Sequence, residues 1–561
     1  MHHHRHYLLA GVLWVILGLL LLWPVACVVQ AGFRDAQGYT FVYVRSIFTD
    51  TYSRWGLINS LLVAASSTAI TLLLGTALAW LSTRYDFRGK GLLNVAVLVP
   101  LILPPFVGAI GIRKIVAPGG AFDALCRALG VPFVDLLTAA PYTLVVLLIA
   151  LHLYPIVLLN VQAALANIDP ATEEAARALG AHGWRLFRCI TLPMMRPGLF
   201  AGATIVFVFA FTELGTPLIV GDRVRALAAV QVFDGLSEIS THPTPYALVS
   251  VLLAISAVVY LVGKVVLGRP IPASENKASV AATTVRLGGW RGRLCAAAFV
   301  LVAVPAVVPH LGVIGFALAE RWRDTILPST LTTDYLQSVL TEDVTRPAIV
   351  NSLKYAALST LLDAVLGFAV AYVVVRTRVV GRSLLDALAM LPLAVPGLVM
   401  AFGFLAVTRP GSPLAWLDPR DDPTALLVVA YAIRRLPYVV RAAAAGLEQT
   451  SVTLEEAARN LGAGGLRTLR RITLPLVSAH LIAGALLAFS FAMLEVSDSL
   501  ILAFERDFFP ITKAIYELGK RIGDGNEMAC ALGVWAMFLL VGTLGIAVRL
   551  LGRRLGALFR F

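Results

Sequence analysis

Hydrophobic residues fill most of this chain in long runs, and short polar segments separate one run from the next. Each run is long enough to cross a hydrocarbon core of about 30 Å as a helix, which takes about 20 residues. The pattern therefore predicts an all-α, polytopic membrane protein with about twelve transmembrane helices. The predicted spans are Tyr7–Val29, Leu57–Leu81, Leu92–Val116, Pro141–Ala166, Pro197–Val220, Pro245–Leu267, Leu294–Ala319, Ile349–Val375, Leu384–Val407, Ala425–Leu447, Ala479–Ala503 and Met528–Leu551.

Composition and charge agree with this prediction. Hydrophobic residues make up 58% of the chain and charged residues 14%, and the mean hydropathy is +0.82. The formal net charge is +13, which we attribute to Lys and Arg retained in cytoplasmic loops rather than to nucleic-acid binding. If the N-terminus lies inside, basic residues clearly outnumber acidic ones in the inner segments, whereas acidic residues are in slight excess outside. We therefore expect both termini to be cytoplasmic.

The residues that could bind a metal or form disulfides show no recognisable pattern. The chain has five cysteines, scattered without the spacing of a zinc site or a disulfide framework. The opening MHHHRH is more typical of an incidental or tag-derived tract than of a metal site. We expect no metal site and no cofactor on this chain.

The second half of the sequence repeats the first. NSLLVAASSTAITLLLGTALA from Asn59 resembles NSLKYAALSTLLDAVLGFAVA from Asn351, and the same offset pairs Pro100 with Pro392 and Pro104 with Pro396. Further along, residues 173–193 and 455–475 are identical at 15 of 21 positions. Six spans per copy give both copies the same orientation, as in parallel repeats. We predict a first half at 1–268, a cytoplasmic linker at 269–293 and a second half at 294–561.

The strongest repeat, 169–193 and 451–475, lies in the inner loop between the fourth and fifth spans of each half. Asp169 before Pro170 is a helix N-cap and first turn, and Gly180 allows the left-handed turn that ends this helix. A second short helix follows, and Pro193 is expected to limit its length. Ser451, Gly462 and Pro475 are the corresponding residues of the second half.

The side chains of this repeat favour contact with another protein. Glu173 and Glu174 suit the positive end of the first helix, and Ala175 with Ala176 leaves a smooth face. Arg185 and Arg188 are three residues apart on the second helix and can project together, as can Arg467 and Arg470. An amphipathic connector on the membrane surface is the alternative, which the duplication disfavours.

The repeat resembles a known family. The pattern E-A-A-x3-G-x9-I-x-L-P is the signature of permease subunits of binding-protein-dependent ABC importers. It is matched by Glu174, Ala175, Ala176, Gly180, Ile190, Leu192 and Pro193, and by Glu456, Ala457, Ala458, Gly462, Ile472, Leu474 and Pro475. Two copies in one chain resemble the fused type I permeases of ferric iron, thiamine and 2-aminoethylphosphonate uptake.

The resemblance implies that 169–193 and 451–475, here named the first and second coupling segments, dock on a nucleotide-binding subunit. The residues expected to couple are Glu173, Glu174, Ala175, Ala176, Gly180, Arg185, Pro193, Glu455, Glu456, Ala457, Ala458, Gly462, Arg467 and Pro475. The chain has no G-x-x-x-x-G-K-[ST] phosphate loop. The implied partners are therefore two copies of an ABC ATPase, which hold ATP and Mg²⁺, and an extracytoplasmic solute-binding protein. The implied location is the bacterial inner membrane.

Ionisable residues inside the spans are candidates for the substrate pathway. Glu213 and Glu495 occupy equivalent places in the two fifth spans, and the residues after them, including Asp498, predict an interrupted helix. Two facing carboxylates would suit a cation, although each could instead simply bond to a neighbouring helix. Arg434 and Arg435 lie in the tenth span, and His152 is the equivalent of Arg434. The arginines would suit an anion or act as counter-ions for the carboxylates, or they would brace Asp363 or another buried acid.

For function, the favoured hypothesis is the permease of an ABC importer that carries ferric iron. An organophosphonate, thiamine or a polyamine are the alternative substrates. A secondary transporter driven by an ion gradient would also have twelve spans in parallel halves, but it would not account for two coupling segments.

Overall fold

The computed structural model describes residues 2–35, 37–102, 105–224, 226–238, 242–266 and 284–551, and most of them are helical. The helices of the first half are α1 (His2–Leu17), α2 (Trp23–Gly32), α3 (Val42–Thr49), α4 (Thr51–Arg84), α5 (Lys90–Ala96), α6 (Pro105–Val116), α7 (Ala121–Ala128), α8 (Leu136–Ala139), α9 (Pro141–Ala166), α10 (Pro170–Ala178), α11 (Gly183–Leu186), α12 (Leu192–Phe211), α13 (Gly215–Val220), α14 (Ala228–Asp234) and α15 (Thr244–Val266).

The second half continues in the same manner. Its helices are α16 (Gly289–Leu318), α17 (Asp334–Ser338), α18 (Thr345–Arg376), α19 (Arg382–Met390), α20 (Gly397–Val407), α21 (Thr424–Gln449), α22 (Val452–Asn460), α23 (Gly465–Thr468), α24 (Leu474–Met493), α25 (Ser497–Leu502), α26 (Ile511–Lys520) and α27 (Gly525–Leu551). The short strands are β1 (Arg34–Asp35), β2 (Gly38–Tyr39), β3 (Tyr85–Asp86), β4 (Val285–Arg286), β5 (Ala319–Arg321) and β6 (Thr330–Leu331).

The described residues contain nine helices that are long and apolar enough to span a membrane, and up to eleven spans if each of two bent pairs counts as one. The predicted tenth span corresponds to α21, which is long enough but carries Arg434, Arg435 and Arg441. The prediction of about twelve spans therefore agrees with the structure if α21 and the two bent pairs are included.

The predicted third and ninth spans, Leu92–Val116 and Leu384–Val407, are not single straight helices. In the third, segments Lys90–Leu101 and Phe106–Ala128 meet at 96°, and in the ninth, Arg382–Leu393 and Gly397–Val407 meet at 103°. Pro392 and Pro396 lie at the second bend, where a missing N–H and a fixed φ prevent a regular helix. Pro100, the counterpart of Pro392, lies in the 3-10 turn Val99–Ile102, whereas Pro104, the counterpart of Pro396, lies outside the described residues.

The fifth span of each half begins in its coupling segment, and here the prediction was wrong. Pro193 and Pro475 were expected to limit the short second helix, but Gly183–Phe211 and Gly465–Met493 each run on as one helix. A π-helical turn precedes each proline, at Phe187–Thr191 and at Leu469–Thr473. The wider turn accommodates a residue that lacks an N–H, so the helix continues.

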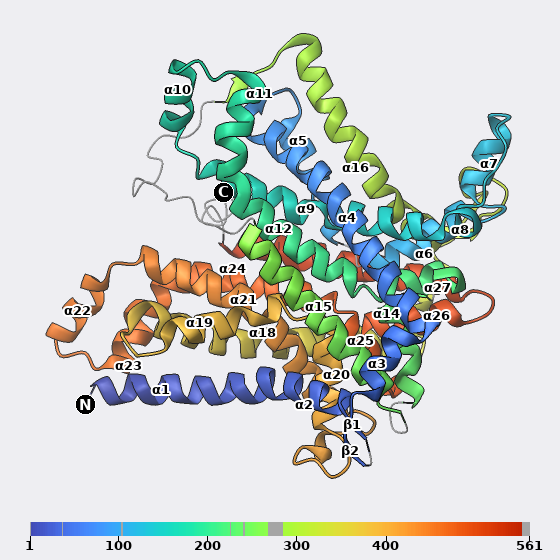
Figure 1. Cartoon of the computed structure of the whole chain (residues 1–561). Coiled ribbons are helices and arrows are strands. Elements are labelled where there is room, and N and C mark those ends of the chain that lie inside the picture. Colours follow the sequence, from blue (N-terminus) through green and yellow to red (C-terminus); the bar gives the residue numbers. More distant parts are fainter. Residues whose placement is uncertain are drawn as a thin grey trace.

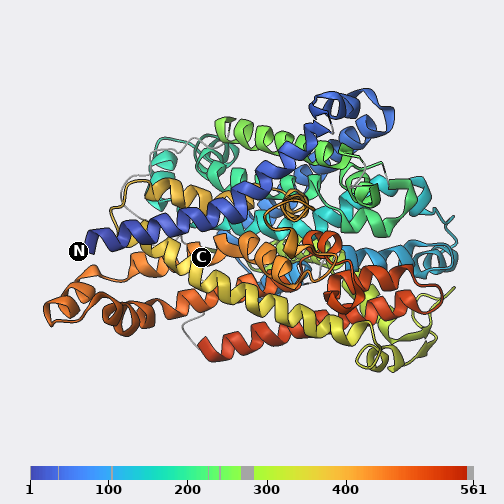
Figure 2. The same cartoon turned by 90° about the horizontal axis from the view of Figure 1, so that it is seen from below.

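The first helix of each half packs against the other half. Helices α1 and α2 contact α18, α19 and α20 of the second half, whereas α16 contacts α4, α5, α6 and α9 of the first. Figures 1 and 2 show α1 running beside the helices of the second half. Each half is therefore completed by a helix from its counterpart.

Most of the predicted linker, residues 269–283, lies outside the described residues. The part that is described differs from the prediction, because β4 pairs in parallel with β3 of the first half and residues 289–293 already belong to α16. Helix α16 therefore begins within the last residues of the predicted linker.

Glycines allow the closest helix contacts within each half. A Cβ on Gly75 of α4 would lie 2.7 Å from Val157 Cβ of α9, and a Cβ on Gly367 of α18 would lie 2.8 Å from Val439 Cγ1 of α21. The two pairs occupy equivalent positions of the repeat. Small residues let helix backbones approach closely where lipid offers no hydrophobic driving force between helices.

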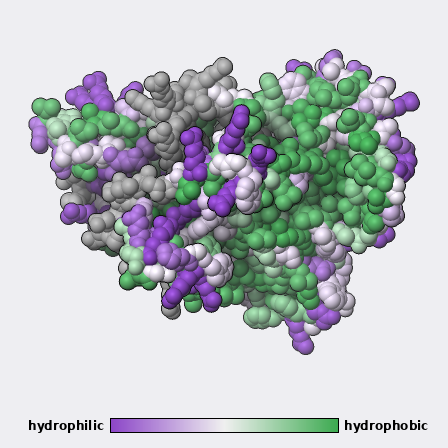
Figure 3. Space-filling view, turned by 90° about the horizontal axis from the view of Figure 1, so that it is seen from above, coloured by the Kyte–Doolittle hydropathy of each residue, from purple (hydrophilic) through white to green (hydrophobic). Residues whose placement is uncertain are grey.

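The outer surface shows where lipid would lie. The space-filling view shows a broad hydrophobic area with hydrophilic side chains beside it and at the far edge (Figure 3). On α1 and the π-helical turn Gly18–Leu22 that follows it, exposed apolar residues recur at helical spacing on one face, where they can contact acyl chains. They are Leu8, Val12, Val15, Leu19 and Leu22.

Candidate functional site

The two coupling segments have the helix ends that the sequence predicts. The Asp169 carboxylate accepts from Ala171 N at 2.9 Å, and Ser451 Oγ accepts from Thr453 N at 3.3 Å. Gly180 and Gly462 have φ of 87° and 82°, the left-handed conformation that ends α10 and α22. Both segments project from the ends of the long helices, toward the same side as the N-terminus (Figure 1).

Within the coupling segments, neighbouring glutamates point in opposite directions. Glu174 and Glu456 are exposed, but Glu173 and Glu455 are buried, with exposures of 3% and 1%, and they bond within the chain. Of the remaining predicted coupling residues, Ala175, Gly180, Arg185, Ala457, Gly462, Arg467 and Pro475 are exposed, Ala458 and Pro193 are partly exposed, and Ala176 is buried.

Each coupling segment carries two large, exposed apolar side chains that the sequence reasoning missed. Leu179 and Leu461 are each 89% exposed, at equivalent positions just before the glycine turn. Trp184 and Leu466, also equivalent, are exposed by 71% and 79%. Exposed apolar residues that recur in both copies of a polar segment are typical of a protein contact. The recurrence of large apolar residues at equivalent positions of the two segments was the sequence signal that could have identified them.

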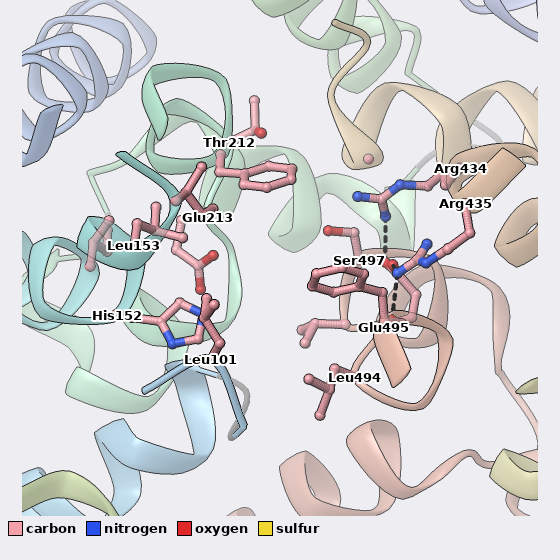
Figure 4. Close-up of a pocket in the computed structure, with 16 residues that line it drawn as sticks. Leu101, His152, Leu153, Thr212, Glu213, Arg434, Arg435, Leu494, Glu495 and Ser497 are labelled. Carbon is pink, nitrogen blue, oxygen red and sulfur yellow. Dashed lines mark hydrogen bonds and ion pairs between the residues drawn. The ribbon is translucent and has the colours of Figure 1, made fainter. Parts of the chain in front are cut away.

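Between the two halves lies a cavity of about 160 Å³. Five of the six predicted pathway residues line it, namely His152, Glu213, Arg434, Arg435 and Glu495, and Asp498 bonds to Arg434 beside it. The predicted helix interruptions are present, since α12 ends at Phe211 before α13 and α24 ends at Met493 before α25. Glu213 and Glu495 lie in these breaks, on opposite sides of the cavity (Figure 4).

On the side of the second half, the charges are paired. Glu495, 3% exposed, bonds to both Arg434 and Arg435, and Arg434 Nη1 also reaches Asp498 Oδ2 at 3.3 Å. Arg435 Nη2 donates to Phe491 O at 2.8 Å. Removing one member of a buried ion pair typically costs about 3–5 kcal/mol, because the other charge is left uncompensated. This network fixes α21 against the break between α24 and α25.

On the side of the first half, the carboxylate has no ion pair among the described residues. Glu213 Oε1 accepts from Thr216 N and Thr216 Oγ1, both at 3.0 Å, which caps α13. The carboxylate points toward the ring of His152 (Figure 4). The two halves therefore place equivalent glutamates at one cavity but give them different partners.

A family model describes both halves of the chain. The model for the binding-protein-dependent transport system inner membrane component matches residues 71–272 and again 363–560, which together make up well over half of the sequence. This chain belongs to that family. Each match contains one coupling segment and one of the two cavity glutamates.

Relatives of this permease align along most of it. A ferric transport system permease protein of Actinobacillus pleuropneumoniae is 26% identical over 494 residues, 85% of this chain and 69% of the relative. A protein of Sinorhizobium fredii described as a probable ABC transporter permease is 26% identical over 559 residues, 97% of this chain and 95% of the relative. A molybdenum transport system permease of Haemophilus influenzae is 37% identical over 164 residues, 28% of this chain and 68% of the relative.

The paired arginines of the permease, Arg434 and Arg435, bond to a buried acid. They pair with Glu495, as expected of counter-ions for the carboxylates, and Glu495 rather than Asp363 is the buried acid that they brace. Asp363 is 1% exposed, and within the described part of the chain neither of its carboxylate oxygens has a hydrogen-bond partner. The guanidinium charges are thus matched within the second half and are not free for an anion.

Proposed function

We propose that this permease is the translocation subunit of an ATP-driven importer and that a separate ABC ATPase docks on each coupling segment. The observation that carries the proposal is the pair of equivalent exposed surfaces, each with a glutamate and a large apolar residue: Glu174 with Leu179, and Glu456 with Leu461. A central apolar anchor with charged residues around it is typical of protein interfaces. The ATPases would hold ATP and Mg²⁺.

Because both coupling segments lie on the same side as the N-terminus, we place this side in the cytoplasm, together with both chain termini. A solute-binding protein then delivers its ligand at the opposite side. Closure of the two ATPases would favour the outward-open permease by a population shift, since it would pull on both coupling segments at once.

For the substrate we propose ferric iron. A relative along most of the chain is a ferric transport permease, and the cavity supports a cation. Glu213 and Glu495 face it, the two arginines are bonded to Glu495, and Asp498 adds a further carboxylate. With His152 neutral, the three carboxylates outnumber the two guanidinium groups, so the formal charge of these residues is negative. Carboxylate oxygens suit a hard cation.

The test is uptake by the complete system in proteoliposomes, reconstituted with a solute-binding protein and an ABC ATPase from the same organism. ATP-dependent uptake of ferric iron in preference to molybdate, thiamine, 2-aminoethylphosphonate and a polyamine is the expected result. Preferential uptake of another ligand would replace the substrate and keep the importer. A matched variant with Glu174→Lys and Glu456→Lys should lose ATPase binding, and full ATP-dependent uptake by that variant would overturn the docking assignment.

A further inference from the structure

An arginine at the inner end of the second span bonds to the buried glutamate of each coupling segment. Arg84 is the last residue of α4, and its Nη2 bonds to Glu173 Oε1. Arg376 is the last residue of α18, and its Nε lies 3.0 Å from Glu455 Oε1. The two arginines and the two glutamates are each equivalent under the repeat, so the chain forms the same contact twice.

The same glutamates also hold the beginning of the fifth span. Thr191 Oγ1 donates to Glu173 Oε1 at 3.0 Å, and Thr473 Oγ1 donates to Glu455 Oε1 at 3.1 Å. Each threonine is the last residue of the π-helical turn that leads into the fifth span. One carboxylate thus joins the second span, the coupling helix and the fifth span.

Further bonds of these residues strengthen the junction. Arg376 Nη2 donates to Thr450 O at 2.7 Å, at the end of α21, which adds the fourth span of the second half. Arg459 lies one turn along α22 and reaches Glu455 Oε2 at 3.4 Å. In the first half Trp80, over which the Arg84 guanidinium lies, meets the ring of Phe187 with centroids 5.2 Å apart.

Burial separates this junction from the docking surface. The carboxylate side chains of Glu173 and Glu455 are 4% and 2% exposed, and that of Arg376 is 6% exposed. Glu174 and Glu456, one residue further on, are exposed. A buried, hydrogen-bonded ion pair holds its elements in one geometry, whereas a surface pair holds them weakly.

The position of the junction gives it a mechanical role. A coupling helix of nine residues, such as α10 or α22, could move as part of a loop if only its ends were attached. Bonded to Thr191, it must move with α12, whose other end leads directly to Glu213 at the cavity. In the second half, Thr473 is connected in the same way through α24 to Glu495 at the cavity.

We propose that Glu173 and Glu455 are positioning residues that fasten each coupling helix to the second and fifth spans, so that ATPase movement reaches the cavity. This inference rests on the proposed docking of ATPases at the coupling segments. It predicts that the carboxylates are needed for coupling rather than for ATPase binding.

The experiment compares Glu173→Gln with Glu455→Gln, combined in one permease, against the unaltered complex in proteoliposomes. The measurements are co-purification of the ATPase, the ATP hydrolysis rate, and the amount of substrate imported per ATP. The ATPase should stay bound and active, while import per ATP should fall about tenfold, within the range of coupling energies between linked sites. Glu448→Gln, an exposed carboxylate at the end of α21, is the matched control and should leave import per ATP unchanged.

An exchanged pair, Arg376→Glu with Glu455→Arg, distinguishes coupling from folding. It should recover part of the import per ATP that Glu455→Gln alone loses, because it restores opposite charges at the junction. Unchanged import per ATP in the double glutamine variant would overturn the inference, and so would loss of ATPase binding in that variant, which would make these residues docking residues. Failure of the unaltered permease to bind the ATPase would instead overturn the proposed function.

Discussion

At the scale of single residues, the two halves treat equivalent carboxylates differently. Glu495 is enclosed by Arg434 and Arg435, whereas Glu213 bonds only to its own helix start among the described residues. The difference follows from the neighbours at the fourth span, where the first half has His152 and Leu153 in place of the two arginines. A cation in the cavity would therefore meet an uncompensated carboxylate from the first half.

This asymmetry makes Glu213→Gln the more informative substitution. It removes a charge from the cavity without leaving an opposite charge unpaired, so we expect uptake to fall about tenfold, as for a loss of about 1.4 kcal/mol, while the complex assembles normally. Glu495→Gln would leave two buried guanidinium groups poorly compensated, so it should also lower the melting temperature.

The measurements are uptake per assembled complex and thermal unfolding in detergent. Glu505→Gln, an exposed glutamate outside the cavity, is the control and should change neither. If Glu213→Gln transports at the normal rate, Glu213 has no role in the pathway.

At the scale of elements, close contacts at glycine fix how neighbouring spans cross. Val439 lies between Gly367 of α18 and Gly484 of α24, and Val157 lies in the same way between Gly75 and Gly202. The contact recurs in both halves, so it belongs to the architecture of the repeat rather than to either copy. It holds the fourth span against the second and fifth spans, to which Glu173 and Glu455 of the coupling segments bond.

We expect Gly367→Leu to destabilise the permease. The added side chain would overlap Val439 and would force α18 and α21 apart, and overpacking of this kind costs about 1–3 kcal/mol. In detergent, we expect the variant to unfold at a temperature several degrees below that of the unaltered permease. At Gly11 of α1 a Cβ would have nothing within 4 Å, so Gly11→Leu is the matched control. Equal melting temperatures for the two variants would contradict the packing argument.

At the scale of the whole molecule, the exchange of first helices makes one unit of two halves. Helices α1 and α2 pack on the second half and α16 packs on the first. Lys114 of α6 also bonds to Glu527 of α27 at 2.9 Å, which adds an ion pair between the halves. The covalent join is then only one of several connections.

We therefore expect two separately expressed chains, 1–275 and 276–561, to assemble in the membrane. Co-purification of one through a tag on the other measures the assembly. A first chain that lacks residues 1–32, and so lacks α1 and α2, should bring down clearly less of its partner. If the complete halves do not co-purify, the covalent join is what holds them together.

The features that depend on local pattern could be predicted from the amino-acid order alone. Hydrophobic run length gave nearly all the spans, and the repeat gave two halves of like orientation. Capping residues such as Asp169 and the glycine turns at Gly180 and Gly462 gave the ends of the coupling helices. The helix breaks at Glu213 and Glu495 also followed from nearby residues, because helix ends and interruptions are governed by neighbours within a few positions.

Which side chains meet could be learned only from the folded chain. Adjacent glutamates such as Glu455 and Glu456 have the same chemistry in the sequence, and it is the position of Arg376, 79 residues away, that turns one inward. Three other features also depend on non-local contacts. The arginines bond to Glu495 rather than to Asp363, the third and ninth spans are bent, and α1 and α16 each pack on the opposite half. Such contacts depend on how the helices cross and on which buried charges can be compensated where they cross. A local sequence pattern contains no information on either.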